Sequence, residues 1–558
     1  LAGNKCYITV EKILEKDEQL PENWPVQGTT GYDFLGMVNR VLTRTKGLTQ
    51  LRESYHQTTG HYKEFDDVVY QSKKLILSER MQGEWDNLTN LFFKLRLLEG
   101  DTTDRFTWND IKTALGEILL VMPVYRLYAD YLPLRGHDAD LFKRTLLEAL
   151  RRNAGIEPAV AIFEDLFLAE KRSTGDRDAR ILQFFSRMMQ LSGPLMAKGV
   201  EDTAMYRYNP CIGRNEVGDG PGSDGTDFDE FHRLMQQRQA NAPLTMNTTS
   251  THDTKRGEDV RARLQILSEM PEEWKEHMSE WMKMNRPMKT RIKGQEAPSV
   301  SEEYLIYQTL VGAAPFDGNF DANFLDRISN FMEKALREAK KNSAWNNPSE
   351  QWEKAVHTFI RDIFNPSHGF STSFLAFQQK IAHYGIFNSL SQLALKCTCP
   401  GVPDIYRGTE LWDLTLVDPD NRQPVDFQYR QRTLKNLKEH YSLSPGKLFQ
   451  SLNTNPENGH IKLWLTHRLL RHRKQNPDLF TKGSYIPLKV RGIHKKHILA
   501  FARHYKNIWH VTVIPTFISL FEKHDKRADP QNIEWKNTRV ILPDEAPAEW
   551  VNIFTGRP

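Results

Sequence analysis

The stretch Asn247-Thr-Thr-Ser-Thr-His-Asp-Thr-Lys-Arg-Gly-Glu-Asp-Val-Arg-Ala-Arg263 decides how the rest of the chain is interpreted. It follows Ala242-Pro-Leu-Thr-Met246, which has the short apolar character of a buried strand, and it leads into a charge-patterned helix. His252 and Asp253 therefore fall where a strand ends and a loop begins. In an α/β barrel, catalytic groups lie at this end of the strands. The alternative is that Asp253 caps a helix over Thr254–Leu264, since aspartate is a favoured N-cap residue.

The bulk composition is typical of a globular protein, with 558 residues of which 39% are hydrophobic and 26% are charged. The net charge of +4 is small for this length, so nothing favours nucleic acid or an acidic membrane as a partner. No apolar run approaches the length of a membrane span, and the first residues carry no signal-peptide pattern. Only four cysteines in so long a chain favour a reducing compartment, so we expect a cytoplasmic protein. Cys397-Thr-Cys399 lies outside the usual zinc spacing and is predicted to belong to a buried segment.

A second strand is predicted near the start of the sequence. The β-branched and apolar residues of Cys6–Leu14 suit a strand that is covered on both faces. Glu11 lies near its C-terminal end, and a carboxylate in this setting is either functional or paired with a buried cation such as Lys12. A buried carboxylic acid would suit a general acid/base role. The turn-rich loop that follows brings Tyr32 and Asp33 towards the end of the strand.

Hydrophobic periodicity predicts helices and, near the C-terminus, strands. Apolar residues at three- and four-residue steps predict helices over Asp66–Leu98, Trp108–Leu120, Asp140–Asn153, Pro158–Lys171 and Arg177–Leu191. Alternating short runs predict strands over Tyr485–Val490, His497–Ala502, Trp509–Ile514 and Arg539–Leu542. Pro194–Tyr208 is predicted to be a strand followed by a loop, Gly213–Gly225 a mobile surface loop, and Gly401–Tyr406 a short strand.

These patterns divide the chain into regions, and the helical blocks are too long to be single barrel crossovers. The regions are a barrel segment with the acid-bearing strand (1–60), a helical insertion (61–193), barrel strands with the His-Asp motif (194–265), a second helical region (266–396), the last barrel strand and helices (397–476), and a β-rich C-terminal domain (477–558).

Specific motifs occur in one order along nearly the whole chain. They are Val10-Glu-Lys-Ile-Leu14, Gly28-Thr-Thr-Gly-Tyr-Asp-Phe34, Met196-Ala-Lys-Gly-Val-Glu-Asp-Thr-Ala204, Ser250-Thr-His-Asp-Thr-Lys-Arg256, Pro400-Gly-Val-Pro-Asp-Ile-Tyr406 and Asp418-Pro-Asp-Asn-Arg422. Together they resemble the motifs of maltooligosyl trehalose synthase, a family in the α-amylase clan of glycoside hydrolases.

The resemblance implies an α/β fold: the C-terminal portion of a (β/α)₈ barrel with large helical insertions and a small C-terminal β domain. It implies a retaining, intramolecular transglucosylation that converts the reducing-end α-1,4 linkage of a maltooligosaccharide or α-1,4-glucan to the α,α-1,1 linkage of trehalose. Glu11 matches the general acid/base and Asp253 the aspartate that stabilises the transition state. The substrate-binding positions that it implies are His252, Lys198, Tyr206 and Tyr208 and, in a second group, Tyr32, Asp33 and Arg256. The sequence has no ligand cluster, phosphate-binding loop or dinucleotide fingerprint, so we expect no metal and no organic cofactor.

The sequence departs from the family pattern at its start. The family's nucleophilic aspartate lies on the barrel strand before that of Glu11, and the sequence given begins after it. Because loss of a nucleophile in double-displacement chemistry removes most of the rate, we expect the chain alone to be inactive or nearly inactive. A separate N-terminal chain that completes the barrel is one interpretation. A 4-α-glucanotransferase or amylase of the same clan and a catalytically dead α-glucan-binding protein are the alternative functions.

Overall fold

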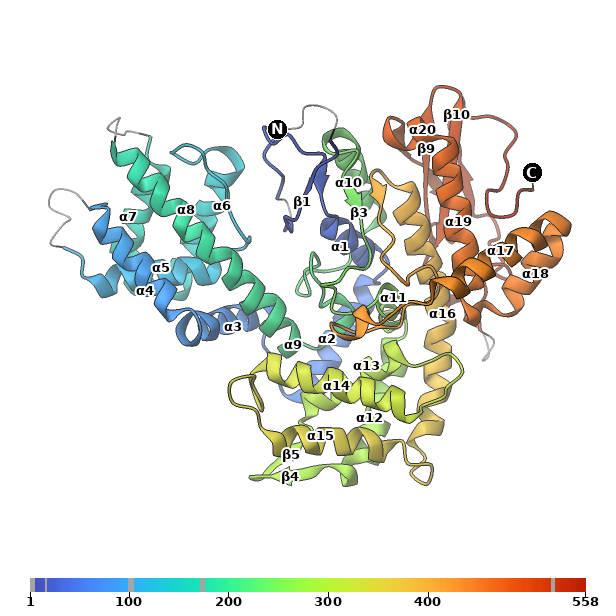
Figure 1. The fold of residues 1–558 in the computed structure, drawn as a ribbon, viewed down its shortest axis with the longest axis horizontal. Helices are drawn as coiled ribbons and strands as arrows, with labels where there is room; N and C mark the ends of the chain where they lie inside the picture. Colours follow the sequence, from blue (N-terminus) through green and yellow to red (C-terminus); the bar gives the residue numbers. More distant parts are fainter. Residues whose placement is uncertain (1–5, 16–17, 99–104, 171–175, 523–526, 558) are drawn as a thin grey trace.

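The computed structural model describes residues 6–15, 18–98, 105–170, 176–522 and 527–557. It is a helix-rich mixed α/β structure in which short strands lie among much longer helices (Figure 1). Helical groups surround a small centre of parallel strands, and the N-terminal and C-terminal segments both lie in the upper part of the view in Figure 1.

Two short parallel strand pairs form the centre. β1 (Thr9–Val10) pairs with β2 (Gly28–Thr29), and β3 (Met246–Asn247) pairs with β6 (Val402–Pro403). The two pairs lie side by side, and a hydrogen bond joins them: the backbone N–H of Thr29 donates to Oγ1 of Thr245 at 3.0 Å. Gly28 permits this approach, since a Cβ at that position would lie 2.3 Å from the Cβ of Thr245.

The first strand differs from its prediction in length and in burial. β1 covers only Thr9–Val10 of the predicted Cys6–Leu14, and the side chains of Tyr7 and Ile8 are 50% and 44% exposed. Both residues of β1 are only partly buried, so the strand is not covered on both faces as expected. The strand predicted within Gly401–Tyr406 is confirmed as the short strand β6. The strand predicted at Ala242–Met246 is displaced, because β3 begins at Met246 and residues 242–245 are not strand.

Helices lie next to the central strands. α1 (Tyr32–Val41) packs against β3, α16 (Phe370–Thr398) packs against β6, and α10 (Phe228–Asn241) bonds to the carbonyl of Met246 through Arg238. α11 (Glu258–Ile266) packs against α1 and α16, and α2 (Thr45–Thr59) packs against helices within residues 271–313. Every residue of α11 is buried, and its main neighbour is α16. Cys397 and Cys399 are fully buried at the end of α16, which confirms their assignment to a buried segment.

A separate helical group lies on the left of Figure 1. It consists of α3 (Phe65–Glu79), α4 (Gln82–Lys94), α5 (Trp108–Val121), α6 (Gly136–Arg152), α7 (Glu157–Leu168) and α8 (Asp176–Met196). These helices share a hydrophobic core that includes the fully buried Phe92, Phe163 and Phe184. The helices predicted here are confirmed, except that the run over Asp66–Leu98 is divided into α3 and α4.

A second helical group lies at the bottom of Figure 1. It consists of α12 (Pro271–Asn285), the hairpin of β4 (Thr290–Ile292) and β5 (Gln295–Ala297), α13 (Val300–Ala313), α14 (Ala322–Ala339) and α15 (Glu350–Ile363). Trp274 and Trp281 are completely buried in its core, which extends to α2 and α16. Ser299 and Glu302 form a capping box that begins α13.

The C-terminal part combines helices with antiparallel strands. The helices are α17 (Phe427–Leu443), α18 (Pro445–Thr454), α19 (His460–Gln475) and α20 (Pro477–Thr481), and the strands are β7 (Ser484–Pro487), β8 (Lys489–Arg491), β9 (Ile498–Tyr505), β10 (Ile508–Pro515) and β11 (Arg539–Ile541). β9 lies between β10 and β7, while β11 pairs with β8. The predicted C-terminal strands are therefore present.

The segment predicted as strand and loop over Pro194–Tyr208 is helical instead. α8 continues into a π-helix, η4 (Ala197–Ala204), and then into the single turn α9 (Met205–Arg207). Val200, Ala204 and Met205 recur at helical spacing and are buried against Phe65, which explains why the helix continues. Their apolar run is too short for its period to distinguish a strand from a helix.

The glycine-rich stretch over Gly213–Gly225 is not the mobile surface loop that was predicted. Its first half is buried around an ion pair in which Nε of Arg214 lies 2.7 Å from Asp219, and both side chains are at most 1% exposed. Among the described residues, no helix is both long enough and apolar enough to cross a membrane.

Candidate active site at the ends of the parallel strands

The loop after β3 presents two polar side chains from a buried base. Thr248 and Ser250 are at most 2% exposed, whereas the side chains of His252 and Asp253 are 54% and 53% exposed. Asp253 does not cap the following helix, because α11 begins at Glu258 after an N-cap at Gly257. The capping alternative is therefore wrong, and the side chain of Asp253 is free to face solvent.

Glu11 meets this pair at the end of β1. One ligand atom each of Glu11, His252 and Asp253 lies within 4.8 Å of the others. Glu11 is exposed rather than buried as predicted, because β1 is not covered on both faces. The alternative that it pairs with Lys12 is also wrong, since the ammonium group of Lys12 bonds to the carboxylate of Glu18.

Within the described ranges, these three side chains also form the cluster whose ligand atoms lie close enough together to hold a metal ion. All three side chains are exposed to water, and exposed acidic groups are common without a bound ion. The cluster therefore does not by itself indicate a metal site. Two carboxylates and an imidazole on one open surface are equally suited to contact the hydroxyl groups and the glycosidic oxygen of a sugar.

Hydrogen bonds along the loop orient Asp253. Its backbone N–H donates to Oγ1 of Thr251 at 3.1 Å, and Oγ1 of Thr251 lies 3.0 Å from the hydroxyl of Tyr32. Nε2 of His252 lies 3.4 Å from Oδ2 of Asp253. Burial raises the pKa of the Tyr32 phenol, so this hydroxyl stays protonated at neutral pH. Tyr32 thus supports the loop that carries the two exposed side chains.

Charged groups from η4 and the loop form a second polar cluster. Asp202 lies between two ammonium groups, 2.7 Å from Nζ of Lys198 and 3.2 Å from Nζ of Lys255. Burial acts to raise the pKa of Asp202, but the two lysines outweigh it and the pKa is lowered. The hydrogen bond from Lys198 to Asp202 raises the pKa of Lys198, whose side chain is 60% exposed. Lys198 therefore offers a charged donor to solvent.

Three predicted substrate-binding residues lie beneath the surface. Tyr206, Tyr208 and Arg256 are 5%, 3% and 3% exposed. The ring of Tyr208 packs 5.3 Å from that of Phe65, and its buried hydroxyl has no hydrogen-bond partner. The Arg256 guanidinium stacks over the ring of Phe331 at 5.8 Å, and burial lowers its pKa to about 10. These three side chains are therefore buried, whereas Glu11, His252 and Asp253 are exposed.

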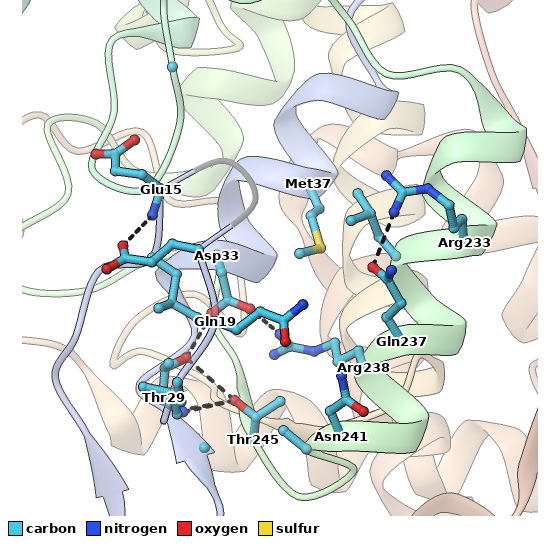
Figure 2. Close-up of a pocket in the computed structure, with 18 of the residues that line it drawn as sticks. Glu15, Gln19, Thr29, Asp33, Met37, Arg233, Gln237, Arg238, Asn241 and Thr245 are labelled. Carbon is cyan, nitrogen blue, oxygen red and sulfur yellow. Dashed lines mark hydrogen bonds and ion pairs between the residues drawn. The ribbon is translucent and has the colours of Figure 1, made fainter. Parts of the chain in front are cut away.

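Asp33 faces a different space, the cavity shown in Figure 2. This cavity has a volume of about 880 Å³ and is lined by α1, α10 and the loop between β1 and β2. The carboxylate of Asp33 is bonded to the guanidinium of Arg238 and accepts from Oγ1 of Thr29 at 2.7 Å. Glu15 also lines the cavity, and burial together with Glu18 and Glu201 raises its pKa to about 7. Glu11, His252 and Asp253 are not among the lining residues.

The sequence did not reveal the buried charged residues that bond to the loop carrying His252 and Asp253. Glu216 accepts the backbone N–H groups of Lys255 at 2.7 Å and Arg256 at 3.2 Å. Glu258 is fully buried between Lys396 and Lys462, whose ammonium groups lie 3.0 Å and 2.8 Å from its carboxylate. In the sequence these residues look like ordinary charged positions of helices and loops. Their pairing becomes visible only when segments far apart in the chain are packed together.

Comparisons with known proteins agree with the motifs. No protein-family model matches the chain. Two Mycobacterium tuberculosis proteins, from strains CDC 1551 and H37Rv and both assigned as maltooligosyl trehalose synthases, are 30% identical over 574 aligned residues. The alignment covers 100% of this chain but 63% of each relative, so the chain spans less than two thirds of their length.

Solved structures give the same result. The maltooligosyltrehalose synthase of Arthrobacter ramosus superposes with a TM-score of 0.75 and 29% identity, covering 92% of this chain and 59% of that one. A second maltooligosyl trehalose synthase crystal structure gives a TM-score of 0.71 and 30% identity, covering 92% of this chain and 60% of its own. In sequence and in structure, the chain is similar to maltooligosyl trehalose synthases, as its motifs predict.

Proposed function

We propose that this chain carries part of the active site of an intramolecular transglucosylase that acts on α-1,4-glucans. The reaction converts the reducing-end α-1,4 linkage of a maltooligosaccharide to the α,α-1,1 linkage of trehalose. The observation that carries this proposal is the meeting of Glu11, His252 and Asp253 within 4.8 Å, although they lie far apart in the sequence. The names of the relatives, which are trehalose-forming synthases, supply the reaction.

The strands support a barrel-type site. We interpret β1, β2, β3 and β6 as strands of a parallel (β/α)₈ barrel, with residues 61–193 and 266–396 as helical insertions and residues 477–558 as a β-rich domain. Glu11 follows β1 and the His252–Asp253 loop follows β3, so both lie at carboxyl ends of parallel strands. This is the end at which barrel enzymes carry their catalytic groups.

In the proposed mechanism, Glu11 protonates the leaving glycosidic oxygen and then, as a carboxylate, accepts the proton of the attacking anomeric hydroxyl. Asp253 stabilises the oxocarbenium-like transition state, and His252 contacts a sugar hydroxyl beside it. Lys198 is the remaining predicted contact with an exposed charged donor. It suits the released glucose, which must be held and turned before it attacks again.

A retaining mechanism also needs a nucleophile, and we assign that role to no residue of this sequence. The expected behaviour of these 558 residues alone is therefore to bind an α-1,4-glucan without forming a trehalose linkage. We propose that the missing carboxylate is supplied by polypeptide corresponding to the part of the relatives that this chain does not span.

The test uses maltopentaose and follows products by proton NMR of the anomeric signals. The chain is assayed alone and together with protein that supplies the remaining part of a relative. A non-reducing pentasaccharide that forms only in the combined reaction, and is lost with Glu11→Gln, supports the proposal. Reducing products alone would indicate an amylase or 4-α-glucanotransferase. Binding without turnover in both reactions would indicate a glucan-binding protein, and absence of binding would overturn the proposal.

A further inference from the structure

The turn after β6 contacts the backbone that carries the two exposed site residues. Asn421 lies in a short 3₁₀ turn, η7 (Asp420–Arg422), and is 7% exposed. Its amide nitrogen donates to the carbonyl oxygen of Thr251 at 3.3 Å and to that of His252 at 3.2 Å. These are the two carbonyl groups that directly precede Asp253. We propose that Asn421 is a positioning residue that holds the His252–Asp253 loop in the orientation facing Glu11.

The turn that carries Asn421 is itself anchored, so it can act as a fixed support. The carboxylate of Asp420 accepts two hydrogen bonds from Arg327, at 3.0 Å and 2.8 Å, and one from the backbone N–H of Leu416 at 2.8 Å. The hydroxyl of Tyr406 donates to the carbonyl of Asn421 at 3.2 Å. These bonds fix the backbone of the turn. The side-chain amide of Asn421 is therefore a fixed donor, and it determines where the carbonyl groups of Thr251 and His252 lie.

The chemistry of the contact requires an amide in one orientation. A single NH₂ group provides two donors, which match the two carbonyl oxygens. The buried Oδ1 of Asn421 has no hydrogen-bond partner, and a flipped amide would place this oxygen against both carbonyls. An aspartate at this position would be repelled by the same carbonyls and would add negative charge close to Asp253.

The loop depends on this support most at His252, because the carbonyl of Thr251 also accepts from Oγ1 of Thr254 at 3.0 Å. The backbone on the far side of Asp253 is held by Glu216, through the N–H groups of Lys255 and Arg256. Among the described residues, the hydrogen-bond partner of the His252 carbonyl is Asn421. Loss of that bond allows the backbone of His252 to move, and with it the carboxylate of Asp253 relative to Glu11. A displacement of about 1 Å at a reacting group is enough to lower a rate by about a hundredfold.

The first test measures the loop itself and needs no activity. Hydrogen exchange is compared in the 558-residue chain with Asn421→Ala, Asn421→Asp and the control Gln423→Ala, which alters an exposed side chain of the same turn. Both Asn421 variants are expected to raise exchange at least tenfold in residues 250–254 and to leave α11 and α16 unchanged, while the control behaves as wild type. Unchanged exchange at 250–254 would overturn the proposal, and so would an equal rise throughout α11 and α16, which reports a general loss of stability.

The second test rests on the proposed function and measures maltopentaose turnover in the completed enzyme. Asn421→Ala is expected to lower kcat by about a hundredfold with a smaller change in KM, because the loop positions a group for the transition state. An unchanged kcat would overturn the positioning role. If the wild type neither binds nor converts maltopentaose, the proposed function fails, while the exchange experiment still decides whether Asn421 holds the loop.

Discussion

Nζ of Lys462 lies 2.8 Å from Oε1 of Glu258, and both side chains are at most 1% exposed. The same ammonium group lies 2.7 Å from Asp259. Lys396 supplies the second positive charge of the cluster, so two carboxylates face two lysines in the interior. Burial acts to raise the pKa of Glu258, but the two lysines outweigh it and hold the pKa well below its usual range. This cluster lies directly below the loop that carries Asp253.

Removing one member of this cluster is expected to destabilise the fold strongly. Lys462→Met leaves Glu258 and Asp259 with one cation instead of two, and an uncompensated buried charge costs about 3–5 kcal/mol. The matched control is Lys435→Met, whose side chain is 77% exposed in a loose ion pair and which is expected to change stability by less than about 1 kcal/mol. Urea denaturation measures both. Equal effects of the two substitutions would contradict the buried-pair interpretation.

The exposure of the proposed catalytic residues predicts the opposite behaviour for them. Glu11→Gln and Asp253→Asn remove no buried contact, so the free energy of unfolding is expected to change by less than about 0.5 kcal/mol. Binding of maltopentaose, measured by calorimetry, is expected to persist in Glu11→Gln. A loss of several kcal/mol in either variant would show that the carboxylate has a structural partner and would weaken its assignment to the site.

Two tyrosines give a matched test of which predicted contacts are structural. The hydroxyl of Tyr208 is buried without a partner, so Tyr208→Phe is expected to be neutral or to stabilise the protein by about 1 kcal/mol. The hydroxyl of Tyr32 bonds to Thr251, so Tyr32→Phe is expected to cost about 1 kcal/mol and to loosen the loop. Thermal unfolding compares the two. Weaker maltopentaose binding in Tyr208→Phe would contradict a purely structural role and support the predicted role of Tyr208 in glucan binding.

The contact between the turn that follows α11 and the C-terminal region is expected to depend on pH. Glu269 is 3% exposed, accepts from the hydroxyl of Ser519 at 2.6 Å, and has its pKa raised by burial from 4.5 to about 7. Because the folded-state pKa exceeds the unfolded one, the protonated acid is favoured by folding. This stabilisation is complete below pH 4.5 and is lost as the pH rises through 7, with a total of about 3 kcal/mol.

Glu269→Gln keeps an acceptor for Ser519 and removes the titration. The difference in unfolding free energy between wild type and variant is therefore expected to vary between pH 5 and pH 8, with wild type losing stability relative to the variant as the pH rises. Denaturation curves at matched ionic strength measure this difference. A constant difference across the range would show that Glu269 does not titrate there.

The helices and the C-terminal strands could be predicted because their signal is local. Apolar residues at three- and four-residue steps identified α5 to α8 to within a few residues, and alternating runs identified β9 and β10. The same method failed over Pro194–Tyr208, where a short apolar run fits either period and the packing against Phe65 selects the helix. It also failed for β1, whose composition suggested a covered strand.

The candidate site could be predicted in part. Strand-end position singled out His252, Asp253 and Glu11, and the motifs supplied their expected roles. Which of the other predicted contacts are exposed was not predictable, because Lys198 and Arg256 both lie in the motifs, yet Lys198 is exposed and Arg256 is buried. Asn421 lies in one of the motifs, but its hydrogen bonds to the loop, like those of Glu216, join segments far apart in the chain and were not predictable from the sequence.

By itself, the sequence determined the helical periods, the order of the motifs and the polar residues at strand ends. These follow from interactions between residues that are near neighbours along the chain, or from motifs that can be read directly. Only the tertiary structure decided that Glu11 meets Asp253, that Lys12 bonds to Glu18, and that Lys462 lies beneath the loop. Partners far apart in the chain are selected by which surfaces pack together, and that selection depends on the burial of the whole core rather than on any single segment.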